Sequence, residues 1–385
     1  MPQAAMHPHA MLLHVMHPHV TPHRVILLLV TLPHVMGRHK FWLNHLDEKG
    51  GQEGLPFFFS WIFEPGTDKR VRMKRLLLDI LICPVCLPQE NILTCHPMDK
   101  DDEDILSGSL QCGMCGTVFP IQEGIAFLLP GASSSNHELR SKYEESSFLS
   151  SYLWSHYGDL LGDVETNTSY AEWAELLGYN PGFSLDAGCA VGRFTFEMSN
   201  KSDFAVGIDI SRSFVRKARE LMINRKLQVR LREEGVIERE QTISLPHSWK
   251  GDKVEFIVAD VQSLPFRACC FPNLASLNVV DKVPFPLAHL KEMNRVARKC
   301  EAQFLFSDPF SWSSEVAREE DWLGGTSKGT YPGRGIDNVS SLLTGERCEL
   351  MPAWKVDRKG HIWWKIRNHQ NNFELIRSCY VKASR

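Results

Sequence analysis

The sequence has no long hydrophobic run and no large excess of charge of either sign. Its best membrane candidate, residues 25–32, ends at a proline and is far shorter than the ~20 residues that span a bilayer. No small-residue cleavage site follows this stretch, which disfavours a secretory signal. The net charge of -3 gives no global basic field and disfavours nucleic acid as a partner. We therefore expect a cytoplasmic protein that binds no membrane.

Cysteine is too scarce for a disulfide framework, with 11 in 385 residues. Four of these cysteines form two Cys-x-x-Cys pairs, which are Cys83, Cys86, Cys112 and Cys115. This spacing predicts one tetrahedral zinc ion held by four thiolates, and such a site is structural because it leaves no open position. The alternatives are unligated thiols, or ligation by the nearby Cys95 and His96.

Changes in composition predict three parts. Residues 1–72 contain nine of the 16 histidines and a near repeat, MHPHAMLLHV followed by MHPHVTPHRV, so we expect a low-complexity, disordered leader. Residues 73–130 form a small module around the cysteine pairs, and a variant that begins at Met73 should keep fold and activity. A Gly/Ser-rich stretch, residues 131–135, separates this module from a large domain over 136–385.

The large domain reads as α/β. Residues 136–182 look helical, and their aromatic residues either pack in the core or form a lid over a ligand. Apolar strands are predicted at 183–185, 205–208, 254–258, 274–277 and 303–306, with helices at 213–224 and 287–298. Residues 225–239 carry mixed charge and are predicted as a solvated helix and loop. Two long strands, 361–368 and 374–382, should form an antiparallel hairpin at one side of the sheet.

A glycine-rich turn follows the first of these strands in the stretch FSLDAGCAVGR, residues 183–193. Gly188 can adopt positive φ, and Gly192 lets the next helix pack close to the sheet. Ala190 occupies the middle position, which disfavours a dinucleotide pyrophosphate. Asp186 lies at the strand end, where a carboxylate can face an ammonium group. The unit is typical of a nucleoside-like ligand at the carboxyl edge of a parallel sheet.

Two further acids end the next two strands. Asp209, in GIDIS, lies about 20 residues past the turn, a spacing that suits a carboxylate accepting from both ribose hydroxyls. Asp260, in ADVQSLPF, could accept from an adenine amino group, with Val261 covering the ring. The plain alternative for each acid is an ordinary strand-end residue, but three such acids at successive strand ends favour a binding site.

The ordered set LDAGCAVGR, GIDIS, ADVQSLPF and the terminal strand pair resembles class I S-adenosylmethionine-dependent methyltransferases over residues 140–385. The resemblance implies a Rossmann-like seven-stranded sheet whose last strand is antiparallel. It also implies a cofactor site for S-adenosylmethionine in which Asp186 and Gly188 lie near the methionine part. The full set of cofactor-binding candidates is Asp186, Gly188, Ala190, Gly192, Asp209, Ile210, Asp260 and Val261.

A narrower resemblance is to the methyltransferase domain of ovothiol synthases. It rests on GCAVGR, Asn278-Val-Val-Asp281, Asp308-Pro-Phe-Ser-Trp312 and Trp322-Leu-Gly-Gly325. That domain is associated with N-methylation of a thiol-bearing histidine, so a small molecule with an imidazole or amine nitrogen is the expected acceptor. Asn278, Asp281 and Asp308 are the catalytic candidates near the carboxyl edge. Trp312, Trp322 and Tyr331 either pack or shape the acceptor pocket.

The cysteine module, from LLLDILICPVC to CGMCGTVFPIQEGIAFLL, resembles the Trm112-like zinc ribbon, a small domain that partners methyltransferases. The resemblance implies that the ribbon docks on the catalytic domain or recruits a macromolecular substrate, and it makes the ribbon a candidate site for a protein partner. Two other functions stay open at this point. One is methylation of RNA or protein brought in by the ribbon, and the other is a non-catalytic scaffold that binds partners.

Overall fold

A computed structural model describes residues 45–46, 52–53, 72–98, 104–131 and 146–385. The chain divides into two compact units, residues 1–67 and 68–385. In the first unit, β1 (His45–Leu46) and β2 (Gln52–Glu53) pair antiparallel. Apart from these four residues and Arg72, the leader predicted over 1–72 lies outside the described residues, as does nearly all of the stretch 131–135. Among the described residues, no helix combines the length and apolar character that a membrane crossing needs.

The cysteine module is a four-stranded antiparallel meander. Its strands are β3 (Leu93–Pro97), β4 (Gly108–Cys112), β5 (Val118–Gln122) and β6 (Ile125–Leu128), and the last two are joined by a tight turn at Glu123 and Gly124. Two 3-10 helices precede them, η2 (Arg75–Asp79) and η3 (Pro84–Cys86). The first Cys-x-x-Cys pair lies at η3, and the second lies at the end of β4 and in the turn after it.

The large domain is built on a mostly parallel sheet, as predicted. Its parallel strands are β7 (Phe183–Ala187), β8 (Phe204–Asp209), β11 (Val254–Ala259), β12 (Asn273–Leu277) and β13 (Gln303–Asp308). The predicted hairpin is β14 (Lys355–His369) and β15 (Asn372–Ser384), and β15 pairs antiparallel with β13. The order β14-β15-β13-β12-β7-β8-β11 gives seven strands with the expected antiparallel one next to β13.

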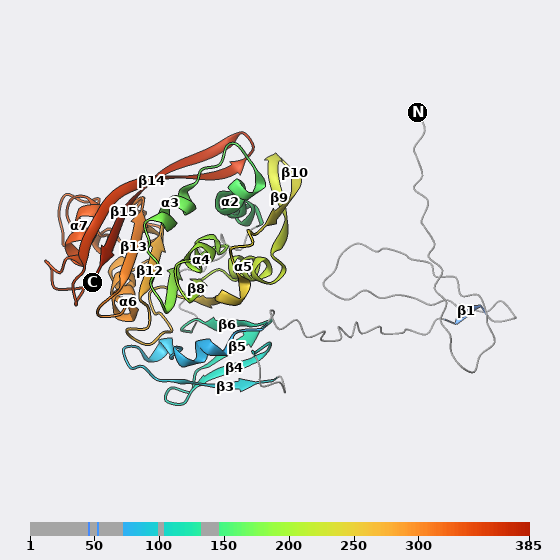
Figure 1. The fold of residues 1–385 in the computed structure, drawn as a ribbon, viewed down its shortest axis with the longest axis horizontal. Coiled ribbons are helices and arrows are strands. Elements are labelled where there is room, and N and C mark those ends of the chain that lie inside the picture. The colour runs from blue at the N-terminus through green and yellow to red at the C-terminus, as the bar shows by residue number, and fades with distance from the viewer. Residues whose placement is uncertain (1–44, 47–51, 54–71, 99–103, 132–145) are drawn as a thin grey trace. The chain divides into compact units, whose positions relative to one another are not determined.

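The sheet does not stop at β11. Strand β6 of the cysteine module pairs parallel with β11 through Val258–Phe127 and Ala259–Leu128, so the meander continues the sheet to eleven strands. Figure 1 shows the module in blue and cyan directly alongside the large domain. The prediction of seven strands is therefore correct for the large domain alone. It missed the extension, because pairing between two modules leaves no local pattern in the sequence.

Helices cover both faces of the sheet. They are α2 (Ser146–Tyr157), η5 (Gly158–Leu161), α3 (Ser169–Glu175), α4 (Arg193–Met198), α5 (Arg212–Asn224), η6 (Gly251–Lys253), η7 (Val280–Lys282), α6 (Pro286–Val296), η8 (Glu319–Asp321) and α7 (Gly335–Leu343). Helix α5 begins where the Ser211 hydroxyl accepts from the Phe214 N–H. Both predicted helices, 213–224 and 287–298, are confirmed within two residues at each end.

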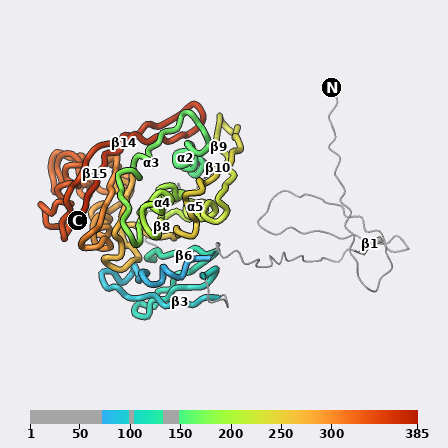
Figure 2. Tube along the Cα trace, in the orientation of Figure 1, coloured from blue at the N-terminus to red at the C-terminus, as the bar shows by residue number. Residues whose placement is uncertain are grey.

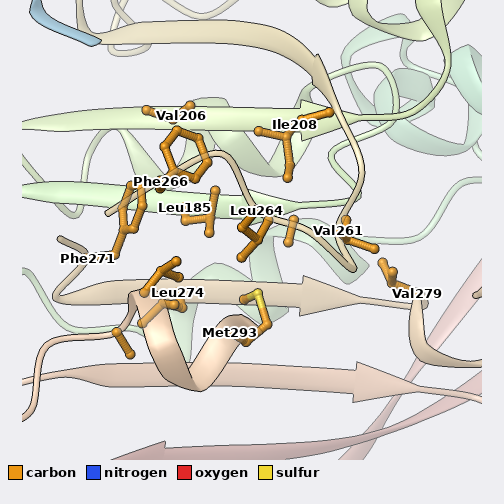
Figure 3. Packing of buried hydrophobic residues seen from close by; sticks show 14 of the residues in the cluster. Leu185, Val206, Ile208, Val261, Leu264, Phe266, Phe271, Leu274, Val279 and Met293 are labelled. Carbon is orange, nitrogen blue, oxygen red and sulfur yellow. The ribbon is translucent and has the colours of Figure 1, made fainter. Parts of the chain in front are cut away.

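Two cores result, one on each face, because alternate residues of each buried strand point to opposite sides. One core joins Leu185, Val206 and Ile208 to Met293 of α6, and Figure 3 shows these side chains packed with the loop residues Leu264 and Phe266. The other core joins Ala205, Phe256 and Val258 to helices α2–α5. The trace in Figure 2 shows α4 and α5, whose side chains belong to this second core, next to β8.

The prediction of a helix and loop over residues 225–239 is wrong. This stretch lies in the hairpin of β9 (Lys226–Glu234) and β10 (Ile237–Ser244). Leu227, Val229 and Leu231 are buried, while the residues between them are exposed. This is a period of two, which a half-buried strand requires, and the charge count concealed it.

Candidate functional site

A cavity of about 610 Å³ opens at the carboxyl ends of β7, β8, β11 and β12. It is lined on one side by the strand ends and the glycine-rich turn. On the other side its lining comes from α2, α3 and the β14–β15 hairpin, with Phe148, Tyr152, His156, Tyr170, Trp364, Ile366, Glu374 and Ile376. Among the described residues, the lining includes none between 72 and 131. The cavity therefore belongs to the large domain.

The turn after β7 is shaped by two glycines. Gly188 has φ +80°, and a Cβ there would lie 2.4 Å from Val279 Cγ2. Gly192 has φ +87°, and a Cβ there would lie 2.7 Å from the Phe256 ring. Both positions therefore need glycine for conformation and for space. Gly188 lines the cavity, whereas Gly192 lies behind it at the start of α4.

Asp209 fixes this turn from the neighbouring strand. Its Oδ2 accepts from the Ala190 N–H at 2.9 Å, and its Oδ1 accepts from the Ser211 N–H at 2.8 Å. Ala190 is held at φ +45°, an uncommon conformation for a residue with a Cβ. A carboxylate offers about four lone-pair sites, so Asp209 can accept further hydrogen bonds from a ligand in the cavity.

Asp186 is the buried carboxyl of the site, with 2% of its surface exposed. Burial raises its pKa to about 7, against the opposing effect of the Thr195 hydroxyl, which donates to Oδ2 at 2.7 Å. The nearby Asp209 charge raises the pKa further. Such a carboxyl needs a cationic partner to ionise fully at neutral pH.

The remaining cofactor candidates also line the cavity. Asp260 Oδ1 accepts from the Gln262 N–H at 2.9 Å, which fixes the carboxylate at the end of β11. Val261 is buried, and Ile210 is partly exposed next to Asp209. The structure therefore brings every cofactor candidate except Gly192 into one cavity wall.

The three catalytic candidates separate into two groups. Asn278 lines the cavity, and its Oδ1 accepts from the Ser378 hydroxyl at 2.7 Å. Asp281 and Asp308 do not line it and are 1% and 0% exposed. Burial raises the pKa of both carboxyl groups.

The two buried acids brace the loops of the rim. Asp281 Oδ2 accepts from the Ser311 N–H at 2.8 Å and from Lys282 Nζ at 3.0 Å. Asp308 Oδ1 accepts from the Phe310 N–H at 2.7 Å. Through these bonds Asp281 holds Lys282 and Ser311, which do line the cavity, and Asp308 holds Phe310, the neighbour of Ser311.

The aromatic residues of the helical segment divide between the two interpretations. Those that fill the core are Trp154, Tyr157 and Trp173, each at most 1% exposed, and those that line the cavity are Phe148, Tyr152 and Tyr170. Trp312 stacks on Trp322 with ring centroids 6.1 Å apart, and neither lines the cavity. Tyr331 is buried and donates to Glu349 Oε2.

Sequence reasoning missed several lining residues, which are His156, Lys282, Trp364, Ile366, Glu374 and Ile376. Lys282 directly follows Asp281, so the sequence alone offered a hint for it. The others come from α2 and the terminal hairpin, far from the motifs, and alternation along residues 364–366 and 374–376 was the one available pattern.

The predicted metal ligands converge. The ligand atoms of Cys83, Cys86, Cys112 and Cys115 lie within 4.8 Å of one another. Cys83 Sγ is 3.6 Å from Cys115 Sγ, and Cys86 Sγ is 3.7 Å from Cys112 Sγ. Neither Cys95 nor His96 belongs to this cluster. Four thiols this close fit a tetrahedral metal site with thiolate ligands.

Comparison with known families agrees with this geometry. Residues 185–300 match the family described as methyltransferase domain. The chain carries a methyltransferase domain. Residues 74–124 match the family described as Trm112p-like protein. The match to the methyltransferase domain begins in β7, the first strand of the cavity wall, and spans the three strand-end acids. The chain also carries a Trm112-like domain.

Solved structures with a similar fold include a complex of the Haloferax volcanii Trm112 methyltransferase activator with a methyltransferase, at 12% identity and a TM-score of 0.37, covering 64% of this chain and 97% of that one. The YcgJ protein of Bacillus subtilis has 11% identity and a TM-score of 0.38, covering 56% and 98%. Phosphoethanolamine N-methyltransferase 2 of Haemonchus contortus has 13% identity and a TM-score of 0.34, covering 50% and 38%. Among curated proteins, none matches this chain significantly.

Proposed function

We propose that the enzyme transfers a methyl group from S-adenosylmethionine to a small molecule, at an imidazole or amine nitrogen. The observation that supports this most is that the acidic strand ends and a set of aromatic side chains line the same cavity. A nucleoside cofactor and a small acceptor can meet there away from bulk water. A thiol-bearing histidine, the acceptor implied by the likeness to ovothiol synthases, is one member of this class.

The cofactor would lie along the strand ends. Asp209 would accept from the ribose hydroxyls with Ile210 beside it, and Asp260 with Val261 would bind the adenine. Asp186, Gly188 and Ala190 would surround the methionine part, whose ammonium group is the cation that Asp186 needs. Gly192 would act indirectly, by letting α4 pack against Phe256. The cofactor supplies an electrophilic methyl group on a sulfonium.

The chain's own contribution is positioning and exclusion of water. Asn278, held by Ser378, would orient the acceptor without taking its proton. Asp281 and Asp308 would act as braces for the loops that carry Lys282 and Ser311, because both are buried away from the cavity. They are positioning residues in this proposal and not general bases.

The four cysteines would hold one structural zinc ion, and the module over residues 73–130 would be a Trm112-like zinc ribbon joined to the methyltransferase domain over 136–385. Its docking on that domain is supported by the β6–β11 pairing. Exposed apolar side chains at both cysteine knuckles, Val85 and Met114, would suit a protein partner.

A macromolecular acceptor is the second candidate, and the match to Trm112p-like proteins favours it. A ribbon that delivered RNA or protein to the reaction would be expected to border the cavity. None of its described residues does so. We therefore rank the small-molecule acceptor first.

Transfer of a labelled methyl group separates these functions. The enzyme would be incubated with labelled S-adenosylmethionine and, in separate reactions, with a panel of imidazoles and amines that includes thiol-histidines, with total RNA, and with total protein. We expect label in the small-molecule panel. Label in RNA or protein alone would contradict the proposal, and label in none of the three would favour a scaffold.

A further inference from the structure

The half of the cavity that faces the strand ends is walled by a continuous set of aromatic rings. Phe148 stacks on Tyr152 with centroids 5.3 Å apart, and Tyr152 lies 6.2 Å from Trp364, edge to face. His156 is 5.8 Å from Tyr152 and 4.4 Å from Tyr170. All five side chains line the cavity. We name this set the aromatic wall.

The β14–β15 hairpin adds a carboxylate to the aromatic wall. In its register Trp364 is opposite Ile376, and Ile366 is opposite Glu374. Residues opposite each other or two apart share one face of a hairpin, so these four side chains form one patch toward the cavity. Glu374 Oε1 accepts from Asn368 Nδ2 at 2.9 Å, which fixes the carboxylate at the edge of this patch.

The aromatic wall itself carries no charge near neutral pH. Burial, together with the nearby Arg193 charge, holds the pKa of His156 well below 6.5. Burial raises the pKa of Tyr170 well above 10, and its hydroxyl lies 2.7 Å from His156 Nε2. Among the described residues that line the cavity, the one Lys or Arg is Lys282, whose ammonium is 3.0 Å from the Asp281 carboxylate. A ligand at the aromatic wall therefore meets neutral aromatic rings and the carboxylate of Glu374, which forms no ion pair with the part of the chain that the structure describes.

We propose that the aromatic wall and Glu374 form the methyl-acceptor subsite and that this subsite selects acceptors whose reacting nitrogen becomes positively charged. The inference rests on the proposed function and adds the residues that decide the acceptor class. Aromatic faces attract cations within about 6 Å of the ring centroid, and a carboxylate adds to this attraction. Hydroxyl, carboxylate and phosphate acceptors gain nothing comparable.

The chemical step explains why such a subsite favours transfer. The lone pair of the acceptor nitrogen forms the new N–C bond while the C–S bond breaks with its electron pair moving to sulfur. The sulfur becomes a neutral thioether, and the positive charge passes to the methylated nitrogen, which then loses its proton to water. Groups that stabilise this charge where it develops act on the transition state.

A cofactor analogue tests the subsite without knowledge of the acceptor. Sinefungin carries an ammonium group where the cofactor carries its methyl group, whereas S-adenosylhomocysteine carries nothing there. Titration calorimetry would give the ratio of the two affinities for the full-length wild type and for Trp364→Leu and Glu374→Gln. Trp363→Leu is the matched control, because Trp363 lies on the opposite face of the same strand and is 47% exposed.

We expect the preference for sinefungin to fall about 5- to 30-fold in Trp364→Leu and Glu374→Gln, while both variants keep their affinity for S-adenosylhomocysteine. In Trp363→Leu the preference should stay unchanged. Glu374→Gln replaces an exposed side chain by one of equal size, so it keeps the test valid if Trp364→Leu does not fold. An unchanged preference in Glu374→Gln would overturn the inference. Failure of the wild type to bind S-adenosylhomocysteine would instead overturn the proposed function, and the inference with it.

Discussion

Asp186 is a carboxyl group inside the protein at the wall of a ligand cavity. Its burial, with the opposing hydrogen bond from Thr195, raises its pKa to about 7. Because this value exceeds the ~3.9 of an unfolded chain, the group stabilises the fold most at low pH. That contribution is lost as the pH rises from about 4 to about 7. A cation bound beside Asp186 would favour the ionised carboxylate and so lower its pKa.

The first prediction is that ligand affinity depends on pH through Asp186. Below about pH 7, binding of the cationic amino group of S-adenosylhomocysteine must release a proton from this carboxyl, so its Kd should fall by up to about tenfold per pH unit as the pH rises. Above about pH 7.5 the Kd should level off. Calorimetry across this range measures the effect. Asp186→Asn should bind more weakly and without this dependence, and a wild-type profile as flat as that of Asp186→Asn would contradict the assignment.

At the scale of single residues, the sequence predicted most of the cavity lining at the strand ends and little of the aromatic wall. Asp186, Asp209 and Asp260 end successive parallel strands, and the ends of such strands meet at one edge by topology alone. Trp364 and Glu374 reach the cavity only because a hairpin at the far end of the chain crosses above it. Long-range approach of that kind has no local pattern to reveal it.

Elements of the two modules are joined by a buried ionic cluster. Glu255 of β11 is 0% exposed and pairs with Arg219 of α5, which is also buried. Its Oε2 accepts from the N–H of Lys74, the residue before η2, at 2.8 Å. Burial lowers the pKa of Arg219 to about 9, against the opposing effect of the nearby Asp104 charge. The cluster links the start of the ribbon to the strand that ends at Asp260.

The second prediction concerns this cluster. Glu255→Gln removes the carboxylate that pairs with the buried Arg219 guanidinium, and we expect the free energy of unfolding to fall by about 3–5 kcal/mol in urea denaturation. Glu240→Gln is the control, because its pair with Arg230 spans 3.1 Å between exposed side chains and should cost about 0–1 kcal/mol. Equal losses in the two variants would show that the buried cluster does not stabilise the fold as argued.

Hydrophobic periodicity identified the central strands, because buried parallel strands are short, apolar and bounded by turns. It failed for β9–β10, where the charged residues on the open face outnumber the buried ones. Leu227, Val229 and Leu231 carry the period, but the charge of the exposed face dominated the interpretation. The pattern of burial and not the composition decides the type of such an element.

On the scale of the whole molecule, the ribbon and the methyltransferase domain share one eleven-stranded sheet. The ribbon also contacts the loop that follows Asp260. The Ile82 N–H donates to the Pro265 carbonyl at 2.9 Å, and the Ala268 N–H donates to Glu90 Oε1 at 2.7 Å. The sequence predicted both modules and their order, but not that the ribbon supports the rim of the cavity.

The third prediction follows from that support. Elemental analysis should find one zinc per chain, and Cys112→Ser should lose it, lower the thermal unfolding midpoint by more than about 5 °C and weaken S-adenosylhomocysteine binding. Cys348→Ser, at an exposed cysteine outside the cluster, should change none of these. A metal-free protein with an unaltered midpoint and affinity would contradict both the metal site and its link to the rim.

The most direct test of the account is calorimetric titration of S-adenosylhomocysteine into the wild type, Asp209→Ala and Asp252→Ala. Asp252 is exposed at the opposite end of β11 from Asp260 and serves as the control carboxylate. We expect one site per chain in the wild type and in Asp252→Ala. In Asp209→Ala, once circular dichroism has shown that the variant is folded, affinity should fall at least about 10-fold, because a charged hydrogen-bond acceptor is lost. Absence of binding by the wild type, or wild-type affinity in Asp209→Ala, would contradict the claim that this row of strand-end acids binds the cofactor.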